Sequence, residues 1–340
     1  MAAGGVRWYN YTGEDDEVPR DATHITVDKS VRVIPAWAFY DNRSIVEVVC
    51  DFNVKGVEIY AFKYCESLRR VIMPGVESVE SDAFYRCVNL TDVECGKLEI
   101  IKNRAFEGCK SLGSINLPSA KIVERSAFHN CKALTDIECG KLEIIKQIAF
   151  SDCTSLGNID LPSARIVERN AFWDCETLAD AKFGDKLERI EERAFYGCPS
   201  LERITIPLKD GIITPDYTFK GFENLKHVDL VEGELHETIA ALQLEEWRIE
   251  MNEEIDSINR ILPTLDAGGW DVDEGYLNEG GKAQAIRLWI RSVIGKIIHH
   301  QAEHQRLLDE EVATTLQLAL PRDIVMNNVL PFLELPSYTF

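Results

Sequence analysis

The chain has 340 residues, 45% of them hydrophobic, which is enough for more than one packed unit of a globular protein. Its formal net charge of −20 repels phosphate backbones and excludes a general electrostatic attraction to nucleic acid. No apolar stretch approaches the roughly 18 residues that cross a bilayer, and no apolar signal region is visible near Met1. We therefore expect a soluble, cytoplasmic protein with no nucleic-acid or membrane partner.

After an acidic N-terminal segment, residues 1–21, a repeat dominates the chain over residues 22–231. Each unit carries one phenylalanine, preceded by alanine in all units but the last, and successive phenylalanines are 22 to 24 residues apart. The nine phenylalanines are Phe39, Phe62, Phe84, Phe106, Phe128, Phe150, Phe172, Phe195 and Phe219. Each unit therefore has the length of one coil of a solenoid.

Other positions of the unit keep a fixed distance from the phenylalanine. Leucine stands at the sixth position, and aliphatic residues stand at the ninth and eleventh, as in Leu112, Ile115 and Leu117. The alternation of the last two predicts a short strand with one buried face. One coil cannot bury its apolar side alone, so the coils are expected to stack around a continuous core.

Seven of the ten cysteines share the third position after the phenylalanine. They are Cys65, Cys87, Cys109, Cys131, Cys153, Cys175 and Cys198. We interpret them as a buried column of small apolar side chains against the phenylalanines. Stacked disulfides are the alternative, but an odd number leaves one thiol unpaired, and no C-x-x-C spacing suggests zinc.

The unit L-x-x-I-x-L-P-S-A-x-I-V-E-R-x-A-F-x-x-C, clearest at residues 112–131 and 156–175, resembles the BspA-like class of leucine-rich repeats of bacteria and protists. The resemblance covers about 60% of the chain. It implies an α/β chain with a right-handed leucine-rich-repeat solenoid used for protein contact, and it brings no catalytic residues. Some bacterial members are surface adhesins, which gives one alternative function.

Residues 95–138 match residues 139–182 at 28 of 44 positions, which indicates that two coils were duplicated together. The position four before each phenylalanine alternates in charge as a result. It reads Glu80, Lys102, Glu124, Lys146 and Glu168. We expect exposed ion pairs between successive coils, each worth about 0–1 kcal/mol.

The outward positions of the predicted strands form an acidic patch in the middle of the repeat, on the side that is concave in such solenoids. The patch is expected to receive a basic or amide-rich segment of a protein partner; a solvated polar face and a calcium site are the alternatives. Its residues are Asp92, Glu94, Asn116, Asp136, Glu138, Asn158, Asp160 and Asp180.

Helical spacing replaces the repeat after Leu230. We expect a long helix over residues 232–263, ended by Pro263, a flexible acidic loop over 264–281, and a helical region over 282–340. Their broad apolar stripes favour a helical hairpin that caps the solenoid or forms a coiled coil with a second chain. His300 and His304 are four residues apart, but no third zinc ligand is evident, so no metal is expected.

Residues 320–333 resemble the opening of an F-box, the module that joins substrate receptors to a ubiquitin ligase. In that alternative, the solenoid selects the substrate. No nucleophile with its base, phosphate-binding loop or dinucleotide fingerprint is present, so neither catalysis nor a cofactor is expected. The sequence favours a non-enzymatic scaffold that binds a protein partner on its acidic strand face.

Overall fold

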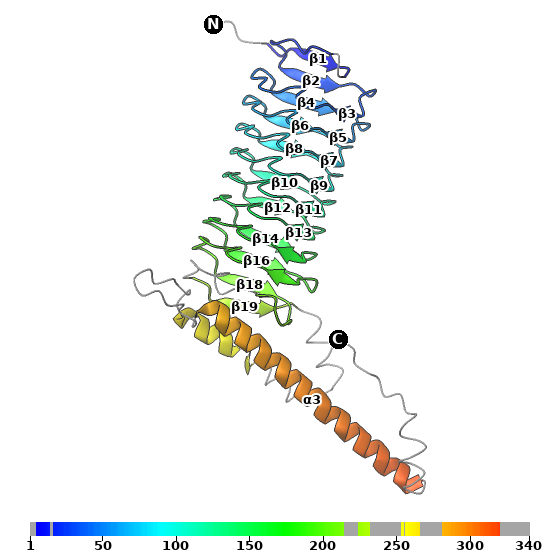
Figure 1. Cartoon of the computed structure of the whole chain (residues 1–340), viewed down its shortest axis with the longest axis vertical. Helices are drawn as coiled ribbons and strands as arrows, with labels where there is room; N and C mark the ends of the chain where they lie inside the picture. Colours follow the sequence, from blue (N-terminus) through cyan, green and yellow to red (C-terminus); the bar gives the residue numbers. More distant parts are fainter. Residues whose placement is uncertain are drawn as a thin grey trace.

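The computed structural model describes residues 5–13, 16–213, 224–231, 253–254, 256–265 and 281–319. Figure 1 shows a column of stacked coils that ends on a long helix. Several parts of the sequence interpretation lie outside these residues. They are the unit around Phe219, residues 232–252, residues 266–280 and the F-box-like segment.

Each coil contributes one longer strand to a parallel array along the column (Figure 1). These strands are β1 (Trp8–Tyr11), β2 (His24–Val27), β4 (Glu47–Cys50), β6 (Arg70–Ile72), β8 (Asp92–Glu94), β10 (Ser114–Asn116), β12 (Asp136–Glu138), β14 (Asn158–Leu161), β16 (Asp180–Phe183), β18 (Arg203–Ile206) and β19 (His227–Leu230). The array begins at β1, earlier than the residue 22 that the repeat pattern suggests, because Trp8–Tyr11 pairs in register with His24–Val27.

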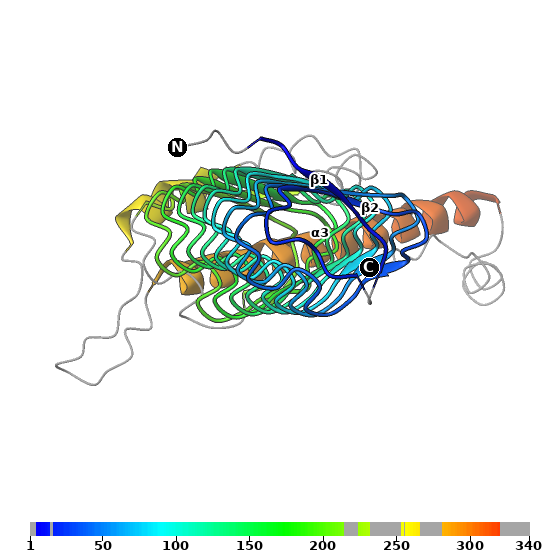
Figure 2. The ribbon, with the colours of Figure 1, turned by 90° about the horizontal axis from the view of Figure 1, so that it is seen from above.

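A second parallel sheet is made of two-residue strands on the return path of each coil. They are β3 (Val33–Ile34), β5 (Gly56–Val57), β7 (Ser78–Val79), β9 (Ile100–Ile101), β11 (Ile122–Val123), β13 (Ile144–Ile145), β15 (Ile166–Val167) and β17 (Arg189–Ile190). Figure 2, along the column, shows the coils superimposed around a common interior. The parallel pairing of equivalent residues confirms the predicted solenoid.

The phenylalanines form a continuous stack in this interior. From Phe39 to Phe195, successive ring centroids are 4.8 to 5.3 Å apart and the ring planes differ by 1° to 10°. Tyr11 closes the N-terminal end, with its ring 4.9 Å from that of Phe39. The backbone fixes this spacing, because the amide N–H of each phenylalanine from Phe39 to Phe172 donates to the carbonyl of the alanine in the next coil, as from Phe106 to Ala127 (2.8 Å).

All ten cysteines are free and buried, which agrees with the predicted column of packed thiols. The thiols of this column also donate to backbone carbonyls, which the sequence interpretation did not foresee. Cys131 Sγ lies 3.2 Å from the carbonyl of Phe106, one coil back, and the other six column cysteines repeat this contact. Cysteine thus fits a site that needs both a small apolar side chain and a weak donor.

Two of the predicted ion pairs between coils are formed. The Lys102 ammonium lies 3.2 Å from Glu124, and that of Lys146 lies 2.7 Å from Glu168. These pairs belong to the two copies of the duplicated coil pair. Their side chains are half-buried and still reach solvent, so each pair contributes little to stability.

Helical segments cover the C-terminal end of the column. Residues 256–261 are helical, a 3₁₀ turn follows at η2 (Leu262–Thr264), and α3 runs from Lys282 to Ala319. The buried Lys282 ammonium donates to the carbonyl of Leu225 (3.0 Å), and Asn259 accepts from the amide of Val228 (2.9 Å). Figure 1 shows α3 passing beneath β19 and continuing beyond the column.

The apolar face of these segments continues the solenoid core. Their buried side chains belong to the same cluster as the solenoid interior: Ile258, Leu262, Ala283, Ile286, Trp289, Ile290, Val293 and Ile297. Trp289 Nε1 donates to the carbonyl of Glu254 (3.0 Å), which joins α3 to the preceding helical residues. The C-terminal region therefore acts as the cap that a solenoid needs at its open end. The side chains of His300 and His304 lie outside the described residues.

Candidate partner-binding face

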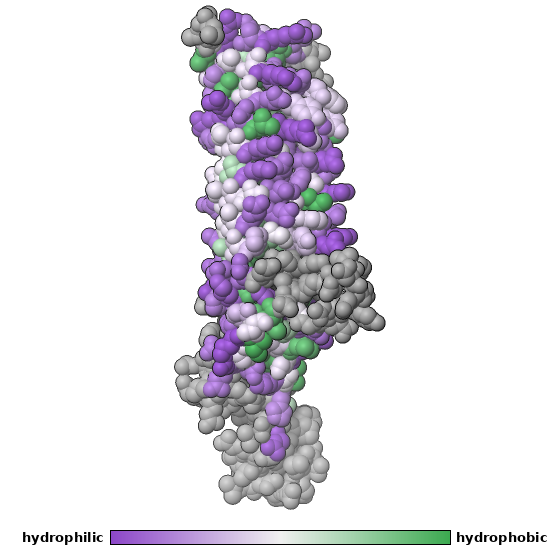
Figure 3. All heavy atoms as spheres, turned by 90° about the vertical axis from the view of Figure 1, so that its left-hand side faces the viewer, coloured by the Kyte–Doolittle hydropathy of each residue, from purple (hydrophilic) through white to green (hydrophobic). Residues whose placement is uncertain are grey.

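The eight residues predicted to bind a partner lie on five successive strands, β8 to β16, and point away from the core. In each strand the central residue is buried, so its two neighbours face outward. Seven of the eight are exposed, and Asp180 is half-buried. We call this surface the long-strand face. The side view in Figure 3 shows a largely hydrophilic surface along the column, as expected for coils that bury their apolar residues inside.

Arg70 neutralises one end of the acidic patch. Its guanidinium lies 3.0 Å from Asp92, 2.5 Å from Glu94 and 3.7 Å from Glu47. The hydrogen bond that Arg70 donates to Glu94 is the main reason that the pKa of Arg70 is raised. Asp92 and Glu94 are thus already engaged within the protein, which the sequence interpretation did not anticipate.

The carboxylates at the other end of the patch are not paired. Within the part of the chain that the structure describes, none of Asp136, Glu138, Asp160 and Asp180 forms an ion pair. Asp180 Oδ1 is buried without a hydrogen-bond partner in the structure. The unpaired negative charge is therefore concentrated on β12, β14 and β16.

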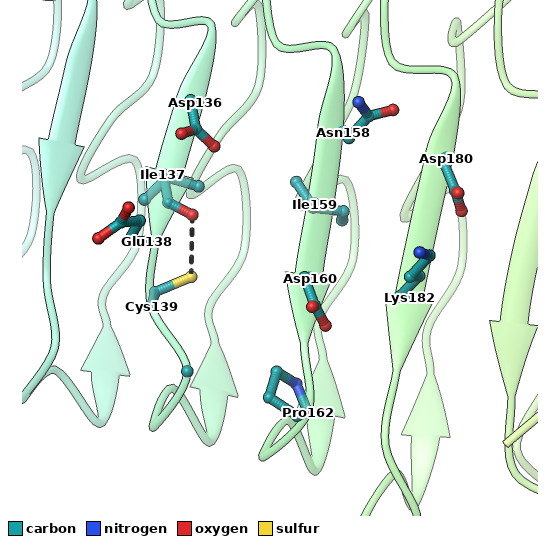
Figure 4. Close-up of a pocket in the computed structure, with 11 residues that line it drawn as sticks. Asp136, Ile137, Glu138, Cys139, Asn158, Ile159, Asp160, Pro162, Asp180 and Lys182 are labelled. Atoms are coloured by element: carbon teal, nitrogen blue, oxygen red, sulfur yellow. Dashed lines mark hydrogen bonds between the residues drawn. The ribbon is translucent and has the colours of Figure 1, made fainter. Parts of the chain in front are cut away.

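These four carboxylates line a shallow open groove of about 420 Å³ across β12, β14 and β16. Asn158, on β14, lies between the strands that carry Asp136 and Asp180 (Figure 4). Lys182 borders the groove on β16 and is paired with Asp160 in the strand register. Ile137 and Ile159 also line the groove, but they are buried, at 6% and 3% exposed, so they offer little apolar surface. The negative charge of the groove can hold a cation.

The groove lies where the long-strand sheet is interrupted. Strand pairing breaks between β8 and β10, and again between β12 and β14. Each break follows a strand that ends at a glutamate, and a cysteine and a glycine come directly after it (residues 94–96 and 138–140). The duplication that is visible in the sequence therefore repeats the break as well as the acidic side chains, and the groove lies across the second break.

The chemistry of the groove does not favour catalysis. Its only thiol, Cys139, is buried, and burial raises the pKa of this thiol to about 12, with smaller contributions from Asp160 and Asp136. Cys139 is thus protonated at neutral pH. Within the described residues, no group of three or more His, Cys, Asp or Glu side chains is arranged to hold a metal ion, so the calcium alternative finds no arranged site in the groove.

Comparison with known families identifies the repeat. The model of the BspA-type leucine-rich-repeat region matches residues 20–135, 77–166 and 143–259, in six copies. The chain belongs to this family. A search of curated proteins found no significant match. Among the described residues, no helix is long and apolar enough to cross a membrane.

Solved structures of leucine-rich-repeat proteins are similar to this chain at low identity. A leucine-rich-repeat protein of Treponema pallidum is 23% identical and has a TM-score of 0.38, over 58% of this chain and 79% of that one. One from Bacteroides ovatus is 19% identical with a TM-score of 0.26, over 63% and 85% of the two chains. A leucine-rich cell surface protein of Faecalibacterium prausnitzii is 18% identical with a TM-score of 0.27, over 63% and 80%. These likenesses concern the fold alone.

The sequence interpretation missed two features. It did not foresee how Arg70 and Lys182, which share the outward positions of the long strands, affect the acidic patch. It also missed a row of exposed and half-buried aromatic residues in the first coils, although tyrosine and tryptophan recur there near the repeated Ala-Phe pair, as in Trp37, Tyr60 and Tyr85. Counting residue types at each position of the repeat unit would have revealed that row.

Proposed function

We propose that this protein is a non-enzymatic scaffold that binds a basic or amide-rich segment of a partner protein on its long-strand face. The observation that carries the proposal is the groove across β12, β14 and β16, lined by four carboxylates that form no ion pair among the described residues. Lysine and arginine side chains fit such a groove, because their charged ends can donate hydrogen bonds to the carboxylates. Asn116 and Asn158 add amides that can pair with polar side chains or with the backbone of the partner.

The charges beside the groove favour a short binding segment. Arg70 and Arg203 lie in the same outward row as Asp92 and Asp180, on β6 and β18, and so enclose the acidic patch at both ends. Arg203 pairs with Asp229 at 2.5 Å. Like charges repel across an interface, so these arginines favour a position of the partner's basic part between β8 and β16.

We further propose that the protein works in the cytoplasm, where thiols stay reduced. The ten free cysteines support this, since the seven in the column donate hydrogen bonds that a disulfide would remove. The ubiquitin-ligase alternative depends on residues 320–333 and the self-association alternative on the helical tail, and both remain predictions. The adhesin alternative depends on the family resemblance alone.

The first experiment is an affinity pull-down from native extract, read by mass spectrometry, with wild type and the variant D136N/E138Q/D160N. These exposed amide replacements keep the shape of the groove and remove three charges. We expect partners bound by the wild type to be lost, and the binding to weaken with rising salt.

The matched control is E176Q/D185N/D256N, which removes three exposed carboxylates away from the groove. It should keep the same partners. Partners retained equally by both variants would contradict the proposed face, while ubiquitin-ligase adaptors among them would favour the F-box alternative.

A further inference from the structure

A second exposed surface lies on the first coils, at the corner that contains the Ala-Phe pair. Five aromatic side chains form a connected set there, which we call the aromatic ridge: Trp37, Tyr40, Tyr60, Tyr64 and Tyr85. The Trp37 ring lies 4.9 Å from Tyr40 and 4.4 Å from Tyr60. Tyr64 continues the set, 6.0 Å from Tyr40 and 5.6 Å from Tyr85. The ridge thus extends across three neighbouring coils.

Folding does not require aromatic residues at these positions. Trp37, Tyr60 and Tyr64 have φ angles of 66°, 61° and 65°, in the left-handed region that bulky residues occupy at a conformational cost. Later coils fill the same positions with residues such as Asp82, Gly108, Ser126 and Asn130. Trp37 is 53% exposed and Tyr40 is 41% exposed, so core packing does not explain them. Exposed tryptophan and tyrosine are typical of binding hot spots.

The ridge already binds cations within the protein. The Lys63 ammonium lies 4.5 Å from the centre of the Tyr60 ring, 4.4 Å from that of Tyr85 and 5.5 Å from that of Tyr64. It also pairs with Asp82 at 3.0 Å, and the Arg86 guanidinium lies 5.3 Å from the Tyr85 ring. These contacts hold the tyrosine half of the ridge in place.

The other half, Trp37 and Tyr40, has no such cation among the residues that the structure describes. Among the described residues, none places an ammonium or guanidinium over Trp37 or Tyr40. The residue that follows Tyr40 in the chain is the exposed Asp41, which pairs with Arg43 at 3.0 Å in a solvent-exposed and weak ion pair. Aromatic faces attract cations, and a chain of net charge −20 attracts them at longer range.

We propose that Trp37 and Tyr40 are a binding site for an arginine side chain of a partner protein. Arginine fits better than lysine, because its planar guanidinium stacks on an aromatic ring and can still donate to a carboxylate such as Asp41. The site is separate from the groove: it belongs to the Ala-Phe corner of the second coil, whereas the groove lies on β12 to β16. The proposal does not depend on the function proposed for the long-strand face.

The test measures binding of two labelled peptides by fluorescence anisotropy at physiological salt. One peptide alternates glycine with arginine, and the other alternates glycine with lysine. The full chain should bind the arginine peptide several-fold more tightly than the lysine peptide. The variant W37A/Y40A should weaken arginine binding by about tenfold, as expected for the loss of two cation–π contacts. Both replacements are at exposed positions, and circular dichroism checks that the fold is kept.

Two controls make the result specific. W173A/Y196A removes another pair of neighbouring rings, 5.3 Å apart on later coils, and should leave arginine binding unchanged. D136N/E138Q/D160N tests the groove on the same peptide. If that variant abolishes binding while W37A/Y40A has no effect, the ridge proposal fails and the long-strand proposal stands.

Other outcomes would also overturn the ridge proposal. Equal affinity for the two peptides would show attraction by charge alone. Tight binding of a neutral proline-rich peptide that W37A/Y40A abolishes would show that the ridge recognises extended proline helices instead. Sedimentation that shows a dimer of the wild type and a monomer of W37A/Y40A would assign the ridge to contact between two copies of this chain.

Discussion

The interior and the exterior of this solenoid follow opposite rules. Inside, each coil from Phe62 to Phe195 repeats the same phenylalanine stack and the same thiol-to-carbonyl contact. Outside, equivalent positions differ from coil to coil: the residue after the phenylalanine is Tyr40, Lys63, Tyr85, Glu107, His129, Ser151, Trp173 or Tyr196. Stability is therefore distributed along the column, whereas candidate binding sites are local.

Two exterior regions illustrate this contrast between a repeated interior and a variable exterior. The aromatic ridge lies on the N-terminal coils and the acidic groove on the duplicated central coils, and both rest on the same interior. On the long strands, a coil can change its outward side chains without disturbing the core, because outward and buried side chains point to opposite sides of each strand. The comparison leads to three predictions on stability.

Alkaline pH should have the largest effect, through the interior. Burial raises the pKa of the thiols, to about 12 for Cys65 and Cys153, whereas an unfolded cysteine titrates near pH 8.5. The unfolded chain therefore loses thiol protons that the folded chain keeps, so stability is complete below about pH 8 and falls toward pH 12. Each thiol contributes up to about 1.4 kcal/mol per pH unit. Melting temperatures between pH 7 and 11, under reducing conditions, would show a steep decline.

The control replaces Cys87, Cys131 and Cys175 with alanine. These changes should lower the melting temperature at pH 7 but flatten its decline with pH, because fewer buried thiols remain. If the melting temperature of this variant declined with pH as steeply as that of the wild type, groups other than the buried thiols would cause the loss of stability at alkaline pH.

Phe128→Ala should have the next largest effect. Its ring is fully buried between those of Phe106 and Phe150, each 5.3 Å away, so its removal leaves a cavity in the middle of the stack. We expect a loss of about 3–5 kcal/mol in urea unfolding followed by circular dichroism. Glu138→Gln, on the exterior of a neighbouring coil, should change stability by less than about 0.5 kcal/mol. Similar effects of the two substitutions would contradict the distinction between interior and exterior.

Ile148→Asn should have a smaller effect, in the stabilising direction. Ile148 has a φ of 63°, and a β-branched side chain is strained there, whereas asparagine is tolerated. We expect a gain of about 1 kcal/mol in the same unfolding assay. Ile144→Asn is the matched control: Ile144 lies in the extended strand β13, so its replacement relieves no strain and should destabilise. A loss of stability in both variants would show that the packing of Ile148 stabilises the fold by more than its backbone strain costs.

Much of the fold could be predicted from the sequence because the repeat is local. The spacing of phenylalanine, cysteine and leucine gave the coil length, and the alternation around Ile115 gave the strand and its outward residues. The eight residues of the acidic patch lie on one face as predicted, since a period of two in each strand fixes the side on which each residue lies. Spacing also predicted the Lys102–Glu124 and Lys146–Glu168 pairs.

The tertiary structure decided which of these residues are available to bind a partner. Arg70 pairs with acidic residues on both neighbouring strands, so Asp92 and Glu94 are already engaged in ion pairs. These pairs depend on the distances between coils. The break between β12 and β14 locates the groove, and the aromatic ridge forms only because rings from three coils meet at one corner. The sequence by itself determined the repeated coil and the direction of each side chain; the stacking of coils decided which charges are neutralised and which rings come together.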